Sequence, residues 1–133
     1  MIVRSVVMLA TVASLLPGSA SAQTAPGLAT ALGVWRGTST CTVKPSSCND
    51  ETVVYRITSG KGNDSLNLDA RKIVNGREEE MGILGCRFAP PDQLSCAIAR
   101  GVWHFTVRAD SLAGELRLTD GTRFRDVRTI RSR

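Results

Sequence analysis

Four cysteines are the residues of this chain most able to do chemistry. Cys41 and Cys48 flank one short proline-containing turn, and Cys86 and Cys96 flank a second. Of the three pairings that four cysteines allow, we predict Cys41–Cys48 and Cys86–Cys96, each closing a local loop and stabilising a small core by about 2–4 kcal/mol. A zinc site is the alternative, but the spacing lacks a C-x-x-C pair and the chain contains a single histidine.

Groups that could act as catalysts are few. His104 lies between Trp103 and Phe105, so on a strand it projects to the opposite face, which we expect to be the outside, with no partner beside it. The acidic run 78–80 alternates between the faces of a strand and is typical of a solvated hairpin end. The sequence has no phosphate-binding loop and no metal motif. We therefore predict a protein that is not an enzyme, with no catalytic residue, metal ion or cofactor.

The aromatic side chains are candidates for binding. The chain contains two tryptophans, one tyrosine and three phenylalanines, and packing in a core explains most residues of this kind. Tyr55, Trp103 and Phe105 are the three that we expect to line a cavity, in which the tyrosine hydroxyl offers a hydrogen bond. This pattern predicts a small, partly apolar ligand.

Positive charge is concentrated near the C-terminus. The six arginines at or beyond position 117 are Arg117, Arg123, Arg125, Arg128, Arg131 and Arg133. Binding of a single-stranded nucleic acid would require exposed aromatic residues between them for base stacking, and the segment does not provide these. We therefore expect no nucleic-acid partner and a solvated last strand, with an acidic envelope protein or surface as the alternative partner.

These residues must be positioned by strands, because apolar and polar residues alternate through most of the chain. From Trp35 to Val43, every second residue falls on one face of a strand. Similar segments are predicted at 50–59, 66–70, 78–88, 94–98, 103–107, 112–118 and 122–130. The dipeptides at 75–76 and 120–121 predict tight turns. Glycines at 82 and 85 predict a bend or bulge, and a slip in the alternation predicts a bulge between Phe124 and Val127.

Eight strands joined by short turns, without a long helical pattern, predict an all-β fold. An antiparallel sheet of this kind removes its edges by closing into an up-and-down β-barrel. A two-sheet β-sandwich is the alternative, because eight strands would also build one. We favour the eight-stranded antiparallel barrel, since successive hairpins rather than crossings between sheets connect the strands.

The N-terminus has the pattern of a cleavable secretory signal. Arg4 precedes an apolar run over 5–16, and small residues follow at 20–22. We predict a signal peptide over 1–22, a flexible N-terminal arm or a short helical turn over 23–32, and a single barrel domain over 33–133. Because Arg4 is the one charged residue of the leader, cleavage would leave 16 of the 17 basic residues and all 12 acidic residues, a net charge of +4. The apolar run is too short to span a bilayer, so we expect a secreted or periplasmic protein with no transmembrane segment after cleavage.

The G-x-W motif at the start of the first strand, together with eight strands and an arginine-bearing last strand, resembles the calycins, the group of lipocalins, avidins and their small bacterial relatives. In lipocalins this tryptophan packs at the closed end of the barrel, beneath an arginine from near the end of the last strand. The resemblance implies structural roles for Gly33, Trp35 and either Arg125 or Arg128. It also implies a small ligand at the open end. The chain is shorter than lipocalins and lacks their C-terminal helix.

The chain also resembles the small periplasmic inhibitors of bacterial metalloproteases. These share its size, its secretion, the eight-stranded barrel and a first strand that leads from a tryptophan, here Trp35, to a cysteine, here Cys41. They carry one disulfide and act through an N-terminal arm placed in the protease cleft. The sequence therefore predicts a non-enzymatic binding barrel, with a protease inhibitor or a structural envelope protein as alternatives.

Overall fold

The computed structural model describes residues 12–18 and 25–133. Residues 12–18 are exposed and form no helix or strand, and the predicted cleavage site of the signal peptide lies outside the described residues. The elements are α1 (Leu28–Ala31), β1 (Gly33–Cys41), β2 (Glu51–Ser59), β3 (Ser65–Val74), β4 (Arg77–Ala89), β5 (Gln93–Ile98), β6 (Gly101–Val107), β7 (Ser111–Leu118) and β8 (Arg123–Arg131). No helix among the described residues combines the length and the apolar character that crossing a bilayer requires.

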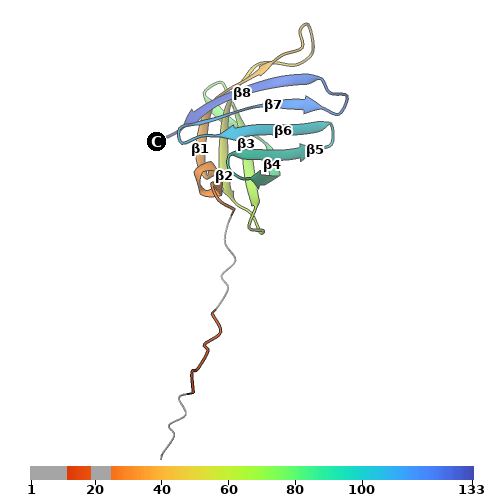
Figure 1. The fold of residues 1–133 in the computed structure, drawn as a ribbon. Helices are drawn as coiled ribbons and strands as arrows, with labels where there is room; N and C mark the ends of the chain where they lie inside the picture. The colour runs from red at the N-terminus through yellow and green to blue at the C-terminus, as the bar shows by residue number, and fades with distance from the viewer. Residues whose placement is uncertain (1–11, 19–24) are drawn as a thin grey trace, which may run out of the picture.

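The eight strands form a closed barrel in sequence order, with each strand antiparallel to its neighbours (Figure 1). The predicted up-and-down barrel is therefore confirmed, and the sandwich alternative is wrong. β8 returns to β1, with Trp35 opposite Arg131 at one end of the pair and Cys41 opposite Arg125 at the other. Closure places alternate residues of each strand inside, where they form one core.

One end of the barrel is closed by the segment that precedes β1. Leu28 and Ala31 of α1 are buried, and Trp35 Nε1 donates a 3.0 Å hydrogen bond to the Ala31 carbonyl. Of the two states expected for 23–32, the structure has the helical turn at 28–31, and Leu28 and Ala31 of this turn belong to the barrel core. Figure 1 shows α1 at one end of the barrel and the loop between β1 and β2 at the other.

Two β-bulges bend the sheet close to the positions that the sequence predicts. Met81 is the extra residue on β4, opposite the step between Ala70 and Arg71 of β3, and the following Gly82 has a φ of 143°, which favours glycine. Phe124 is the extra residue on β8, opposite the step between residues 116 and 117 of β7. Each bulge shifts the alternation of inward and outward side chains by one residue, so it decides which side chains face the core.

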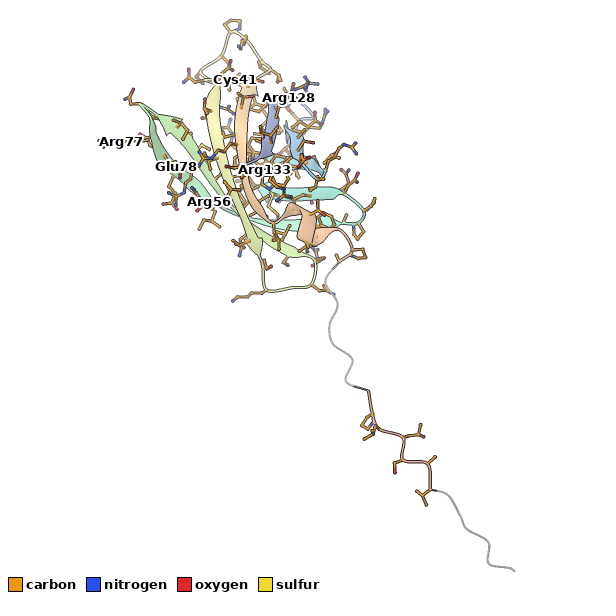
Figure 2. The ribbon with its side chains drawn as sticks, turned by 90° about the vertical axis from the view of Figure 1, so that its left-hand side faces the viewer. Cys41, Arg56, Arg77, Glu78, Arg128 and Arg133 are labelled. Carbon is orange, nitrogen blue, oxygen red and sulfur yellow. A yellow bond between two sulfur atoms is a disulfide. The ribbon has the colours of Figure 1, made fainter. Side chains whose placement is uncertain are left out.

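β4 is longer than the strand that follows it. It pairs with β5 only from Cys86 to Ala89, so the segment 77–85 has a strand neighbour, β3, on one side alone within the described residues. On the outer face, Glu78 accepts hydrogen bonds of 2.7 and 2.9 Å from Arg56 of β2, and Figure 2 shows the two side chains together. The β3–β4 hairpin is thus tied to β2 from outside while one edge of β4 stays uncovered.

Both predicted disulfides, Cys41–Cys48 and Cys86–Cys96, are present, and no cysteine is free. The zinc alternative is therefore wrong. Cys41 is the last residue of β1, which ends two residues before the predicted end at Val43, and the disulfide closes the loop that follows. Cys86 and Cys96 lie opposite each other on β4 and β5, inside the core. Two disulfides indicate an oxidising environment outside the cytoplasm.

Candidate ligand-binding site

A cavity of about 230 Å³ opens at the end of the barrel opposite α1. Its apolar lining residues are Leu68, Ala70, Met81, Gly82, Leu84, Trp103 and Phe105, and its polar lining residues are Ser39, Glu51, Tyr55 and Arg125. The part of β4 that extends beyond β5 contributes Met81, Gly82 and Leu84. The cavity therefore lies where the barrel wall lacks one strand contact.

Three aromatic rings form one wall of the cavity. Trp103 and Phe105 follow each other on the inner face of β6, with ring centroids 5.9 Å apart and planes only 4° from parallel. Tyr55 of β2 meets Phe105 edge-on, at 6.1 Å and 68°. The structure thus brings together the three residues that the sequence singled out for a cavity. Stacked and edge-on pairs hold such rings in fixed orientations, so this wall is preorganised.

Arg125 supplies the cationic side of the cavity. Its side chain is 13% exposed, and its Nη1 donates to the Ser39 hydroxyl at 3.1 Å and to the Ser39 carbonyl at 3.3 Å. Its Nη2 donates to the Asn49 carbonyl at 3.0 Å and lies 3.6 Å from Glu51 Oε1. The guanidinium and the carboxylate therefore form a close ion pair at the rim, whose total charge is zero.

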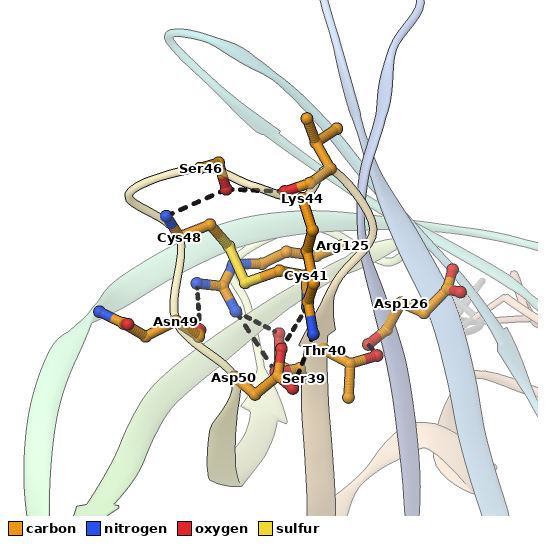
Figure 3. Close-up of polar contacts among 11 residues, drawn as sticks. Ser39, Thr40, Cys41, Lys44, Ser46, Cys48, Asn49, Asp50, Arg125 and Asp126 are labelled. Carbon is orange, nitrogen blue, oxygen red and sulfur yellow. Dashed lines mark hydrogen bonds and ion pairs between the residues drawn. A yellow bond between two sulfur atoms is a disulfide. The ribbon is translucent and has the colours of Figure 1, made fainter.

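The loop between β1 and β2 holds the partners of this arginine in place (Figure 3). The disulfide between Cys41 and Cys48 closes the loop, and the Asp50 carboxylate accepts a 2.8 Å hydrogen bond from the backbone N–H of Cys41. That hydrogen bond is the main reason that the pKa of Asp50 lies below its ordinary value, and the Lys44 ammonium lowers the same pKa further. Both links fix residues 49–51 at the rim of the cavity.

Tyr55 places a hydroxyl inside the cavity. Tyr55 is 4% exposed, and no described residue forms a hydrogen bond with the hydroxyl. Every fully buried side-chain nitrogen or oxygen of the described residues has a partner, so this hydroxyl reaches the cavity space rather than the packed core. Burial raises the pKa of Tyr55, and the nearby Glu51 carboxylate adds to the rise. The hydroxyl is therefore protonated at neutral pH and can donate a hydrogen bond.

The arginine that covers Trp35 is Arg131, and not Arg125 or Arg128. Arg131 Cζ lies 4.2 Å from the centroid of the Trp35 ring. Gly33, with a φ of 126°, leaves room for it, because a Cβ there would lie 2.8 Å from Arg131 Nη1. The bulge in β8 explains the error in the prediction, since it sets the odd-numbered residues from 125 to 131 on the inner face. Arg128 is exposed on the outer face, and Arg125 lies at the opposite end of the barrel.

Several lining residues were missed by the sequence analysis. Ser39 could have been found from the sequence, because it is a polar residue on the inward face of the predicted first strand. In the structure it is only 1% exposed. Glu51 carried no such signal, since its place at the rim depends on how the loop before β2 closes. Met81 and Gly82 line the cavity because of the bulge, which the sequence predicts only to within a few residues.

The groups considered for catalysis lie apart from the cavity. His104 is exposed on the outer face of β6, as expected from its position between two inward aromatic residues. Glu78 is held by Arg56 on the outer face of the sheet. Within residues 12–18 and 25–133, no group of three or more histidine, cysteine or acidic side chains is placed to hold a metal ion.

Comparison with known proteins supports the fold alone. The chain matches no known protein-family profile and no curated protein sequence. Among solved structures, it is similar to a redesigned β-barrel, with a TM-score of 0.59 over 84% of this chain and 99% of that chain and a sequence identity of 13%. A likeness at this identity extends to the barrel architecture, and it does not assign the chain to the calycins.

Proposed function

We propose that this protein is a secreted or periplasmic, non-enzymatic binding protein that takes one small, partly apolar ligand into its barrel. The cavity is the observation that carries the proposal. It combines an ordered aromatic wall with a few polar groups, and that combination is typical of small-molecule sites. The two disulfides support a compartment outside the cytoplasm.

The volume of the cavity limits the size of the ligand. Pockets for drug-sized molecules measure about 300–1,000 Å³, whereas a dry cavity of about 150 Å³ holds benzene. The cavity of this barrel, at about 230 Å³, lies between the two. We therefore expect a ligand of one ring, or a short chain of similar size, with a small polar group.

The inhibitor alternative depends on an N-terminal arm that enters a protease cleft. Within the part of that arm that the structure describes, Leu28 and Ala31 are buried in the barrel core, and the Ala25 backbone N–H donates a 2.9 Å hydrogen bond to the Asn63 carbonyl. No contact of residues 25–31 favours a blocking role. The ligand proposal is therefore the one with a specific observation behind it.

Titration of the mature protein with toluene, followed by backbone amide NMR, tests the proposal. We expect saturable shifts at residues around the cavity and none around Trp35 at the closed end. The variant Ala70→Phe fills the cavity, because Ala70 lines it, and should lose these shifts while remaining folded. Ile130→Ala is the matched control, because Ile130 is 68% exposed and outside the cavity. Absence of saturable shifts at the cavity in the unmodified protein, with toluene and with polar probes built on the same ring, would exclude the proposal.

A further inference from the structure

The charge of the cavity is balanced. Among its lining residues, the groups charged at neutral pH are Glu51 and Arg125, one of each sign, 3.6 Å apart. An anionic ligand that approaches the arginine also meets the carboxylate, and a cationic ligand that approaches the carboxylate also meets the arginine. Either would bring an unbalanced charge into a largely apolar space, which is unfavourable unless a further partner compensates it.

The cavity also presents unused hydrogen-bonding capacity of both kinds. The Tyr55 hydroxyl has no partner among the described residues. Glu51 meets Arg125 at a distance beyond hydrogen-bond range, and no described residue donates to its carboxylate. A guanidinium carries five N–H donors, and Arg125 makes three hydrogen bonds with them, to two carbonyls and the Ser39 hydroxyl, so donor capacity remains. Donors and an acceptor therefore lie together at one side of the aromatic wall.

Resting on the proposed function, we infer that the ligand is electrically neutral and joins one apolar ring to a polar group that both donates and accepts hydrogen bonds, as a carboxamide does. The ring stacks within the wall of Tyr55, Trp103 and Phe105. The polar group accepts a hydrogen bond from Tyr55 or Arg125 and donates one to Glu51. Neutral polar groups satisfy both sides of the ion pair without separating it.

Four probes that share one phenyl ring test this inference on the unmodified protein: the isosteric set benzamide, benzoate and benzamidinium, and toluene, which lacks the polar group. Dissociation constants are measured by the same NMR titration at neutral pH and moderate salt. We expect benzamide to bind at least tenfold more tightly than either charged probe, and more tightly than toluene. Benzoate or benzamidinium binding as tightly as benzamide would overturn the inference.

The toluene measurement separates the two proposals. If toluene binds at the cavity but benzamide does not bind more tightly than toluene, the inference about the polar group is wrong and the binding function stands. If none of the four probes shifts the resonances of the cavity, the proposed function itself is wrong. The comparison of probes uses the natural sequence, so it does not depend on any variant folding correctly.

Two substitutions locate the effect. Glu51→Gln removes the negative charge, so we expect the preference for benzamide over benzoate to fall by tenfold or more, while benzamidinium weakens further. Tyr55→Phe removes one hydroxyl, so benzamide should weaken several-fold while toluene is unchanged. An unchanged benzamide-to-benzoate ratio in the folded Glu51→Gln variant would overturn the assignment of charge balance to this pair.

Discussion

Each end of the barrel has one arginine on the inner face of β8, but one arginine is packed against the core and the other borders a cavity. Arg125 and Arg131 both face inward from β8, six residues apart. At the closed end, Arg131 donates to the carbonyls of Ala109, Leu32 and Thr30 while its guanidinium covers the Trp35 ring. At the open end, Arg125 borders a cavity and forms an ion pair with Glu51.

The difference shows that the surroundings, and not the residue type, decide what an inward arginine does. α1 places the carbonyls of Thr30 and Leu32, at the end of the helix, beside Trp35, and these accept two of the three hydrogen bonds that the Arg131 side chain donates. No helix covers the open end within the described residues, so space remains around Arg125. We therefore expect the closed end to determine stability and the open end to determine binding.

The largest expected effect on the free energy of unfolding comes from replacing the tryptophan at the closed end, compared with replacing the tryptophan at the open end. Trp35 is fully buried, with 0% of its surface exposed, so Trp35→Ala should lower the free energy of unfolding by about 3–5 kcal/mol. Trp103 is partly exposed at the cavity, so Trp103→Ala should cost about 1–2 kcal/mol but abolish toluene binding. Guanidinium unfolding under non-reducing conditions, followed by circular dichroism, measures both. Equal losses of stability in the two variants would contradict the expectation that the closed end determines stability and the open end determines binding.

The second effect concerns the two arginines themselves. Arg131→Met leaves three carbonyls without their donor and removes the cation from the Trp35 ring, so it should cost about 2–4 kcal/mol. Arg125→Met should cost about 1–2 kcal/mol, because the new side chain can occupy the cavity and Glu51 lies at the rim, where water can reach it. The same unfolding experiment compares them. A larger loss for Arg125→Met would show that the open end also stabilises the fold.

The fold was predictable because its signals are local. Alternation with a period of two marks each strand, the dipeptides at 75–76 and 120–121 mark two tight turns, and each disulfide closes a loop of a few residues. The short helix was expected only as one of two states. Its burial depends on contacts between Leu28 and residues distant in the sequence, which no local pattern encodes.

The site was predictable only in part, because closing a barrel is a long-range event. Tyr55, Trp103 and Phe105 could be found because an aromatic residue on the inward face of a barrel strand either packs in the core or lines a cavity. That Arg131 covers Trp35, rather than Arg125 or Arg128, could not be read from the sequence, because it depends on a one-residue bulge at Phe124 and on the register between β8 and β1. Glu51 meets Arg125 only after that register is set.

The smallest expected effect is the loss of stability at alkaline pH that comes from ionisation of Tyr55, the one tyrosine of the chain. Burial raises its pKa above the ordinary value of 10, so the folded protein keeps a proton that the unfolded chain loses. Stability from this group is therefore complete below pH 10 and falls as the pH rises further. The ultraviolet absorbance of tyrosinate should rise at a higher pH in the folded protein than in urea.

A matched variant separates this effect from the titration of other groups. Tyr55→Phe should remove the part of the alkaline loss of stability that comes from this hydroxyl, while leaving the remainder. If the folded protein ionised its tyrosine at the same pH as the unfolded chain, the hydroxyl would be in contact with bulk water rather than enclosed. Saturation with benzamide should shift the titration of Tyr55 to still higher pH, because a hydrogen bond donated by the neutral hydroxyl favours its protonated form. The closed end has no such group, so the shift would report on the open end alone.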